Sequence, residues 1–143
     1  GAMGYSVPAG VSAALAHKDQ LVLSFVGDGG FMMSGQELAT AAQYGATPIV
    51  LLFNNGIYGT IRMHQERDHP ERISGTTLIN QDFCKMAEGY GAHAERVTKT
   101  ADFAAAFERA RASGRPALIE LVTNPEQIST RTTITKLRDA AKK

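Results

Sequence analysis

Two short, fully apolar runs constrain the fold of this chain more than any other feature. Residues 21–26 (LVLSFV) and 49–53 (IVLLF) lack helical length and are typical of strands buried on both faces of a sheet. Between them, residues 34–44 carry a helical apolar pattern that ends at Gly45. A strand, a helix and a second strand in this order predict two parallel strands joined by a right-handed crossover.

The remaining chain continues this alternation. We expect helices over residues 7–16, 80–90 and 100–112, and strands over residues 94–97 and 117–122. The pattern predicts an α/β fold with an open, doubly wound and mostly parallel sheet flanked by helices. Residues 1–143 are expected to form one domain, with residues 124–143 as a peripheral tail that is helical or frayed. Residues 56–79 are polar and poorly periodic, which predicts a long functional loop.

Local polar residues suggest where two of these helices begin. Ser34 and Glu37 have the spacing of a capping box at the start of the helix after the first strand. The helix over residues 80–90 has Asn80 or Asp82 as its predicted N-cap.

Length, net charge and composition narrow the class of protein. With 143 residues, a net charge of +1 and 43% hydrophobic residues, neither disorder nor a general affinity for nucleic acid is indicated, so any bound anion is held locally. The single cysteine, Cys84, excludes an internal disulfide, favours a reducing, cytoplasmic setting and lies in an apolar, core-like pattern. No apolar run approaches the roughly 18 to 20 residues of a membrane span, so no membrane partner is expected.

Polar motifs follow both of the apolar strands over residues 21–26 and 49–53. Asp28 lies between glycines after the first strand, and Asn54 and Asn55 follow the second. In open parallel sheets, ligands bind at the carboxyl ends of the strands. The Asp28 carboxylate, the Asn55 amide oxygen and a backbone carbonyl beyond it are hard donors with one negative charge. Mg²⁺ takes such oxygens and completes its octahedron with phosphate oxygens and water.

Gly29 and Gly30 complete this prediction, because residues without side chains let a phosphate approach the N–H groups at a helix start. The predicted ligand is a metal-bound diphosphate. Asp-Gly and Asn-Gly are also common hairpin turns, and each loop taken alone is open to that reading. We favour the ligand site because a helical pattern follows Asp28 and a polar segment without alternation follows Asn55.

These residues resemble a known family. The run Gly27-Asp28-Gly29, followed after 24 residues (30–53) by Asn54-Asn55, resembles the signature of thiamine diphosphate enzymes. The segments GAMGYSVPAG (1–10) and ELATA (37–41) are similar to the diphosphate-binding domain of that family. The closest resemblance is to the group of acetolactate synthase and benzoylformate or pyruvate decarboxylase, and it extends from residue 1 to about residue 125.

The resemblance implies roles for individual residues at a thiamine diphosphate and Mg²⁺ site. It implies that Asp28, the Asn55 side chain and the backbone carbonyl of Ile57 ligate Mg²⁺. The cofactor-binding set that it implies is Gly1, Met3, Gly27, Asp28, Gly29, Gly30, Asn55 and Ile57. Within it, Gly29 and Gly30 donate main-chain N–H groups, Met3 supports the bent cofactor, and the Gly1 carbonyl accepts from the aminopyrimidine. The start Gly1-Ala2-Met3 also matches a cleaved tag remnant, in which case the last two roles fail.

A substrate pocket is implied by residues 58–65 (YGTIRMHQ), which align with the segment lining it in the family. Thr60 and Ile61 are candidate residues of the pocket wall. Arg62 is a candidate partner for a substrate carboxylate, and His64 is a candidate group that acts on the substrate. A solvated role for Arg62 and His64 remains open. Biosynthetic acetohydroxyacid synthases typically carry tryptophan where this chain has His64, which puts that particular activity in doubt.

The function that the resemblance implies is the diphosphate- and Mg²⁺-binding part of a 2-oxo acid decarboxylase or carboligase similar to acetolactate synthase. In that family, a glutamate from a pyrimidine-binding domain, usually across a subunit interface, activates the cofactor, and no stretch here resembles that domain. The family's domain also begins some tens of residues before the position of Gly1. We therefore expect a domain truncated at its N-terminal side, a homo-oligomeric full enzyme and no turnover by this chain alone.

Two alternatives remain open. One is a non-catalytic subunit or relic that contributes a cofactor half-site to a partner chain. The other is a Mg²⁺-dependent phosphoryl-transfer domain, which is weakened because no lysine lies near Gly27 to Gly30.

Overall fold

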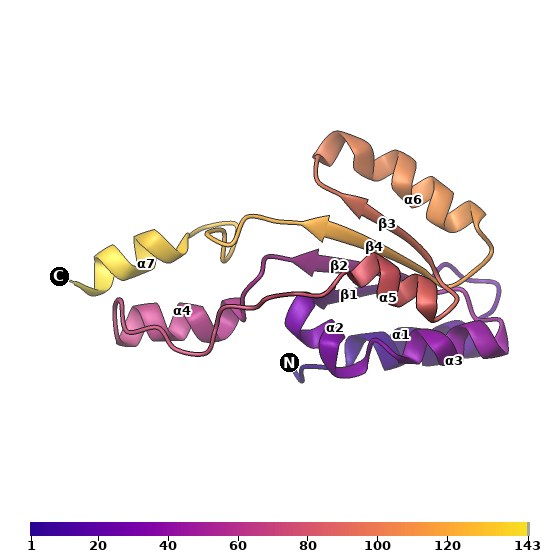
Figure 1. Cartoon of the computed structure of the whole chain (residues 1–143), viewed down its shortest axis with the longest axis horizontal. Helices are drawn as coiled ribbons and strands as arrows, with labels where there is room; N and C mark the ends of the chain where they lie inside the picture. Colours follow the sequence, from indigo (N-terminus) through magenta and orange to yellow (C-terminus); the bar gives the residue numbers. More distant parts are fainter. Residues whose placement is uncertain (143) are drawn as a thin grey trace. The chain divides into compact units, whose positions relative to one another are not determined.

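A computed structural model describes residues 1–142, which fall into two compact units (Figure 1). The first unit comprises Gly1–Asn54 and Asn80–Val122. The second comprises Asn55–Ile79 and the segment from Thr123 onward. Among the described residues, no helix has both the length and the apolarity needed to cross a membrane.

The first unit is built on a four-stranded sheet in which every neighbouring pair is parallel. The strands are β1 (Leu23–Gly27), β2 (Ile49–Asn54), β3 (His93–Val97) and β4 (Ala117–Val122), in the spatial order β1-β2-β4-β3. Its helices are α1 (Ser6–Ala16), α2 (Asp28–Ser34), α3 (Glu37–Tyr44), α5 (Phe83–Gly89) and α6 (Phe103–Ala112), with a short 3-10 turn η1 (Thr100–Asp102) before α6. The predicted α/β class and the parallel crossover between residues 21 and 53 are confirmed.

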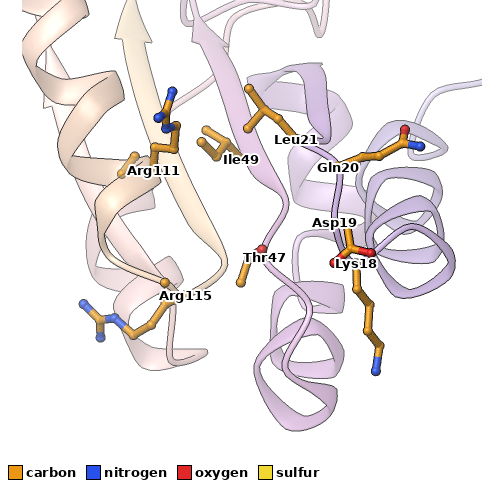
Figure 2. A pocket seen from close by; sticks show the side chains of 10 residues that line it. Lys18, Asp19, Gln20, Leu21, Thr47, Ile49, Arg111 and Arg115 are labelled. Atoms are coloured by element: carbon orange, nitrogen blue, oxygen red, sulfur yellow. The ribbon is translucent and has the colours of Figure 1, made fainter.

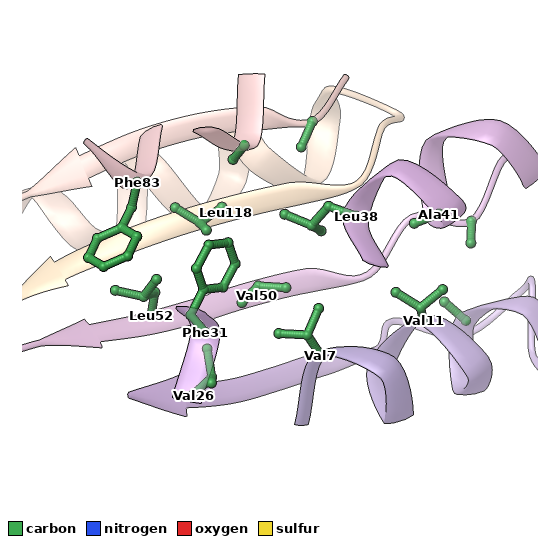
Figure 3. Close-up of a cluster of buried hydrophobic side chains, with 14 residues drawn as sticks. Val7, Val11, Val26, Phe31, Leu38, Ala41, Val50, Leu52, Phe83 and Leu118 are labelled. Atoms are coloured by element: carbon green, nitrogen blue, oxygen red, sulfur yellow. The ribbon is translucent and has the colours of Figure 1, made fainter. Parts of the chain in front are cut away.

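The larger part of the core lies on the face of the sheet that carries α1, α2, α3 and α5 (Figure 3). At its centre the rings of Phe31 and Phe83 meet edge to face, with their centroids 5.6 Å apart. Val50 and Leu52 of β2 and Leu118 of β4 lie against them and are fully buried. This packing fixes α2, and therefore its first residue, against the sheet.

Helix α6 covers the opposite face over β3 and β4. Ala106 and Ala110 are buried there, with Phe103 and Phe107 packed beside them. The helix expected over residues 100–112 is confirmed from Phe103 onward.

Burial of residues 21–26 on both faces is wrong. Along β1 the side chains alternate, so that Ser24 and Val26 are buried while Leu23 and Phe25 are 39% and 59% exposed. The reason is topological, because β1 is an edge strand of the described sheet and α6 lies over β3 and β4. The prediction holds for residues 49–52 of β2, which are all buried, and is wrong for Phe53, which is 39% exposed.

The capping box is also wrong. The helix after β1 begins directly at Asp28, so Ser34 falls in the last turn of α2, where its hydroxyl donates to the carbonyl of Gly4 at 2.7 Å. The Glu37 carboxylate accepts from the Thr40 hydroxyl instead, and no described side chain caps α3. The end at Gly45 is confirmed by its left-handed φ of 66°. At α5 the predicted cap is confirmed for Asp82, which accepts from the Lys85 N–H at 3.2 Å.

The second unit holds α4 (Gly59–Asp68) and α7 (Ile134–Ala141), which pack together. The loop predicted over residues 56–79 is therefore partly helical. The one buried residue of α4 is Glu66, whose carboxylate accepts from Arg62 at 3.1 Å and from Arg138 of α7 at 2.7 and 2.8 Å. Apolar periodicity misses such a helix because an ion pair, and not an apolar stripe, holds it.

Glu66 gives this unit a pH-dependent stability. Hydrogen bonding to Arg138 lowers the Glu66 pKa from 4.5 to about 2, so its contribution is present above pH 4.5 and disappears as the pH falls through 2. We predict that Glu66→Gln lowers the free energy of unfolding by about 3 kcal/mol at pH 7, because two arginines lose their buried partner. The difference from wild type shrinks below pH 4.5 in urea titrations followed by circular dichroism. Glu108→Gln, which removes an exposed carboxylate 3.9 Å from Arg111, is the control, and an equal effect of both variants contradicts the prediction.

Candidate functional site

Asp28 lies at the carboxyl edge of the sheet of the first unit. It follows Gly27, the last residue of β1, opens α2 and is only 3% exposed. Because Gly27 pairs in register with Phe53, the residues that follow, Asp28 and Asn54, lie at the same edge. The sequence prediction that the two motifs end neighbouring parallel strands is confirmed.

The Asp28 carboxylate is held from both sides. Its Oδ1 accepts from the Gly29 N–H at 2.9 Å, and its Oδ2 accepts from the Asn80 side-chain amide at 2.8 Å. The same Asn80 amide nitrogen also donates to Asn54 Oδ1 at 2.9 Å. Asn80 thus joins the ends of β1 and β2.

The glycines around Asp28 differ in how much space surrounds them. A Cβ on Gly30 would lie 3.2 Å from Val26 Cγ2, so this glycine allows α2 to pack closely on β1. A Cβ on Gly27 would meet no described atom within 4 Å, and its φ of −80° suits any residue. Packing within the described chain therefore explains Gly30 and leaves open space beside Gly27.

The N-terminal segment is tied to the same helix. Gly4, at a φ of +79°, accepts from Ser34, and a Cβ at this position would lie 3.1 Å from Met33 Cβ. Met3 is 49% exposed and Gly1 is exposed. The two N-terminal residues with predicted cofactor roles are therefore accessible, and they precede a segment anchored on α2.

Asn55 and Ile57 belong to the second unit, where they form a tight turn. The Asn55 Oδ1 accepts from the Ile57 N–H at 3.2 Å, and Gly56 between them adopts a φ of 69°. The Leu78 N–H donates to the Gly56 carbonyl at 2.8 Å and closes the turn. Asn55 directly follows the last residue of β2.

The four candidate substrate residues all lie on α4. Thr60, Ile61 and His64 are exposed, and the spacing of residues 60, 61 and 64 places them on one side of the helix. His64 Nδ1 lies 2.8 Å from an Arg67 nitrogen. Arg62 instead donates to Glu66, so its guanidinium is engaged in an ion pair within the second unit.

The side chain of Glu120, on β4, extends the polar cluster and was missed by sequence reasoning. It is 2% exposed, accepts from the Asn54 amide at 2.7 Å and from Arg96 at 2.7 Å, and lies 3.7 Å from the Cys84 sulfur. Burial, reinforced by Glu120, raises the pKa of the Cys84 thiol to about 12, so this cysteine remains a neutral thiol packed on the core as predicted. A charged residue inside an apolar strand was the available signal.

By their chemistry, the oxygen donors of the predicted site suit a hard cation with an anionic partner. Across the described residues, no group of three or more His, Cys, Asp or Glu side chains is placed to hold a metal. The predicted site needs no such group, since it combines one carboxylate with amide and carbonyl oxygens and leaves positions for phosphate. The donor chemistry therefore fits Mg²⁺ bound together with a diphosphate.

A pocket of about 260 Å³ lies at the opposite, amino edge of the sheet (Figure 2). Its lining includes Lys18, Asp19, Thr47 and Arg115, from the loops before β1, β2 and β4, together with Ile49. No residue predicted to bind ligand lines it.

Comparison with known proteins places the chain in a family. Residues 1–121 match the family model described as thiamine pyrophosphate enzyme, C-terminal TPP binding domain, thiamine pyrophosphate being another name for thiamine diphosphate. The chain therefore belongs to the thiamine pyrophosphate enzyme family. The resemblance inferred from the Gly27-Asp28-Gly29 and Asn54-Asn55 motifs is confirmed.

Individual relatives in the family carry different activities. The chain is 39% identical over 132 residues to the acetolactate synthase large subunit of Corynebacterium glutamicum, covering 88% of this chain and 21% of the relative. It is 37% identical over 134 residues to 3D-(3,5/4)-trihydroxycyclohexane-1,2-dione hydrolase of Bacillus subtilis, covering 89% and 21%. The chain thus spans about a fifth of the length of the curated relatives that it matches.

A solved structure agrees with the fold. The thiamine diphosphate-dependent 4-hydroxybenzoylformate decarboxylase of Rhodococcus jostii RHA1 superposes with a TM-score of 0.81 at 36% identity, covering 85% of this chain and 23% of that one.

The different demands on the glycines can be tested by stability. We predict that Gly27→Ala changes the free energy of unfolding by less than about 0.5 kcal/mol, because the added methyl group enters open space. Gly35→Ala is the matched substitution at a crowded position, where a Cβ would lie 2.6 Å from the Phe31 ring, and it costs about 1 to 3 kcal/mol. Equal losses in urea titrations of both variants would contradict this assignment of space beside Gly27.

Proposed function

We propose that this chain is the diphosphate- and Mg²⁺-binding part of a thiamine diphosphate-dependent 2-oxo acid decarboxylase or carboligase similar to acetolactate synthase. The observation that carries the proposal is the buried Asp28 carboxylate at the end of β1, held beside Asn54 at the end of the neighbouring strand. The relatives named acetolactate synthase and 4-hydroxybenzoylformate decarboxylase support the reaction class.

In this proposal the chain supplies three ligands to Mg²⁺, namely an Asp28 carboxylate oxygen, the Asn55 amide oxygen and the Ile57 carbonyl. Gly30, in the first turn of α2, directs its N–H group toward the diphosphate, as helix N-termini do toward anions. The Gly29 N–H reaches the diphosphate only if it shares or exchanges its bond to Asp28 Oδ1. Gly27 leaves room beside these glycines. When bound, the cofactor supplies a carbanion that attacks a carbonyl and a ring that accepts the electrons released with CO₂.

The N-terminal residues and α4 have supporting roles. The exposed Met3 side chain supports the bent cofactor, and the Gly1 carbonyl accepts from the aminopyrimidine. Thr60, Ile61 and His64, exposed on one side of α4, contact the 2-oxo acid substrate. Arg62 reaches a substrate carboxylate only if it exchanges its bond to Glu66.

Catalysis in this proposal requires a second polypeptide segment. A pyrimidine-binding domain or subunit supplies the activating glutamate, and the complete enzyme is a cytoplasmic homo-oligomer. The same premise admits a second function, a non-catalytic half-site that acts only with a partner chain. Adding a chain that carries the pyrimidine-binding domain separates them, because restored decarboxylation supports the enzyme part and tight assembly without turnover supports the half-site. Decarboxylation by this chain alone contradicts both.

The cofactor site is tested by calorimetry with thiamine diphosphate in the presence and absence of Mg²⁺. We predict that Asp28→Ala weakens Mg²⁺-dependent binding at least about 100-fold, a loss of about 2.7 kcal/mol, because it removes the only charged ligand of the proposed set. Asp19→Ala removes an exposed carboxylate at the amino edge of the sheet and serves as the matched control. Unchanged Mg²⁺-dependent binding by Asp28→Ala would refute the proposed site.

A further inference from the structure

A chain of side-chain hydrogen bonds crosses one face of the sheet and ends on Asp28. It begins at Arg96 of β3, whose Nε donates to Glu120 of β4 at 2.7 Å. The other Glu120 oxygen accepts from the Asn54 amide of β2 at 2.7 Å. Asn54 Oδ1 accepts from Asn80 at 2.9 Å, and Asn80 donates to Asp28 at 2.8 Å. This series of hydrogen bonds therefore runs from β3 through β4 and β2 to the end of β1.

Donor and acceptor chemistry fixes how the two amides in this series of hydrogen bonds are oriented. An ionised Glu120 only accepts hydrogen bonds, so Asn54 must turn its NH₂ group toward it and its oxygen toward Asn80. Asn80 must then present its own NH₂ group to Asn54. The second proton of that NH₂ group is directed to Asp28 Oδ2. The buried Glu120 carboxylate therefore sets the orientation of both amides.

We propose that Asn80 is a positioning residue that orients the Asp28 carboxylate for the metal ion. Gly29 holds Oδ1 of Asp28 and Asn80 holds Oδ2, so both rotation of the carboxylate and its placement at the strand edge are fixed. The inference rests on the proposed function, because it concerns a carboxylate that we assign to Mg²⁺. Groups that orient a metal ligand without touching the metal typically change metal affinity by about 10- to 100-fold.

The segment that carries Asn80 is held in place by contacts at the start of α5. Glu120 is buried and paired with Arg96, and Arg96 also donates to Asp82, the N-cap of α5. Asn80 lies two residues before that cap, so the segment that carries it is fixed at the start of α5. The position of Asn80 therefore derives from contacts that do not include Asp28.

The test uses Mn²⁺ as the probe, in the presence of thiamine diphosphate, with bound and free metal measured by electron paramagnetic resonance. We expect Asn80→Ala and Asn80→Leu, which remove the donor with and without loss of volume, to weaken Mn²⁺ binding by about 10- to 100-fold. Gln81→Ala removes the exposed neighbouring amide and is expected to stay within twofold of wild type. Asp28→Ala removes a proposed metal ligand itself and therefore shows the largest loss of Mn²⁺ binding to be expected.

A spectroscopic signature separates positioning from general stabilisation. In ¹⁵N-edited spectra the side-chain NH₂ pair of Asn80, identified by its absence in Asn80→Ala, is expected to exchange slowly with solvent and to shift when Mg²⁺ and thiamine diphosphate are added. A role confined to stability leaves these signals unmoved by the metal.

The outcomes distinguish the two proposals. Mn²⁺ binding that is lost in Asp28→Ala but stays within twofold of wild type in both Asn80 variants overturns the role of Asn80 and leaves the metal site standing. An Asn80 NH₂ pair that does not respond to metal overturns it as well. Equal Mn²⁺ binding by wild type and Asp28→Ala, or none by wild type, overturns the metal site and this inference together.

Discussion

The parallel pairing of β1 with β2 is the constraint on which the candidate site depends. The register that pairs Val26 with Leu52 and Gly27 with Phe53 brings Asp28 and Asn54 to one edge of the sheet. A slip of one residue would turn every side chain of one strand to the other face, so Asn54 would no longer reach Glu120 or Asn80. The buried packing of Val50 and Leu52 beneath α2 opposes such a slip. The hydrophobic core and the polar edge are therefore specified by the same register.

Much of this arrangement could be predicted from the sequence, because the relevant signals are local. The apolar run at residues 49–53 marks a strand, and Gly45 before it marks the end of a helix, from neighbouring residues alone. The position of Asp28 then follows from a general rule, since parallel strands joined by a crossover place their carboxyl ends together. The edge exposure of β1 could not be obtained this way, because it depends on which strands α6 covers.

The parts that escaped prediction depend on polar contacts between residues distant in sequence. The sequence predicts Asn80 only as a helix cap, whereas its side chain bridges Asp28 and Asn54, 52 and 26 residues away. Glu66 and Arg138, 72 residues apart, hold α4, which has no apolar stripe, to α7. Such pairs leave no periodic trace in the sequence, and a buried charge becomes recognisable only when its partner is known.

Paramagnetic broadening of backbone amide signals offers the most direct test that a metal-bound diphosphate lies at the carboxyl edge of the sheet. Mn²⁺ is added to the ¹⁵N-labelled protein with and without thiamine diphosphate. The account predicts that signals of Gly27, Asp28 and Gly29 are lost only when the cofactor is present, while those of Gln20 and Gly114, which line the pocket at the amino edge, persist. Broadening of Gln20 and Gly114 with sharp signals at Asp28 would contradict it.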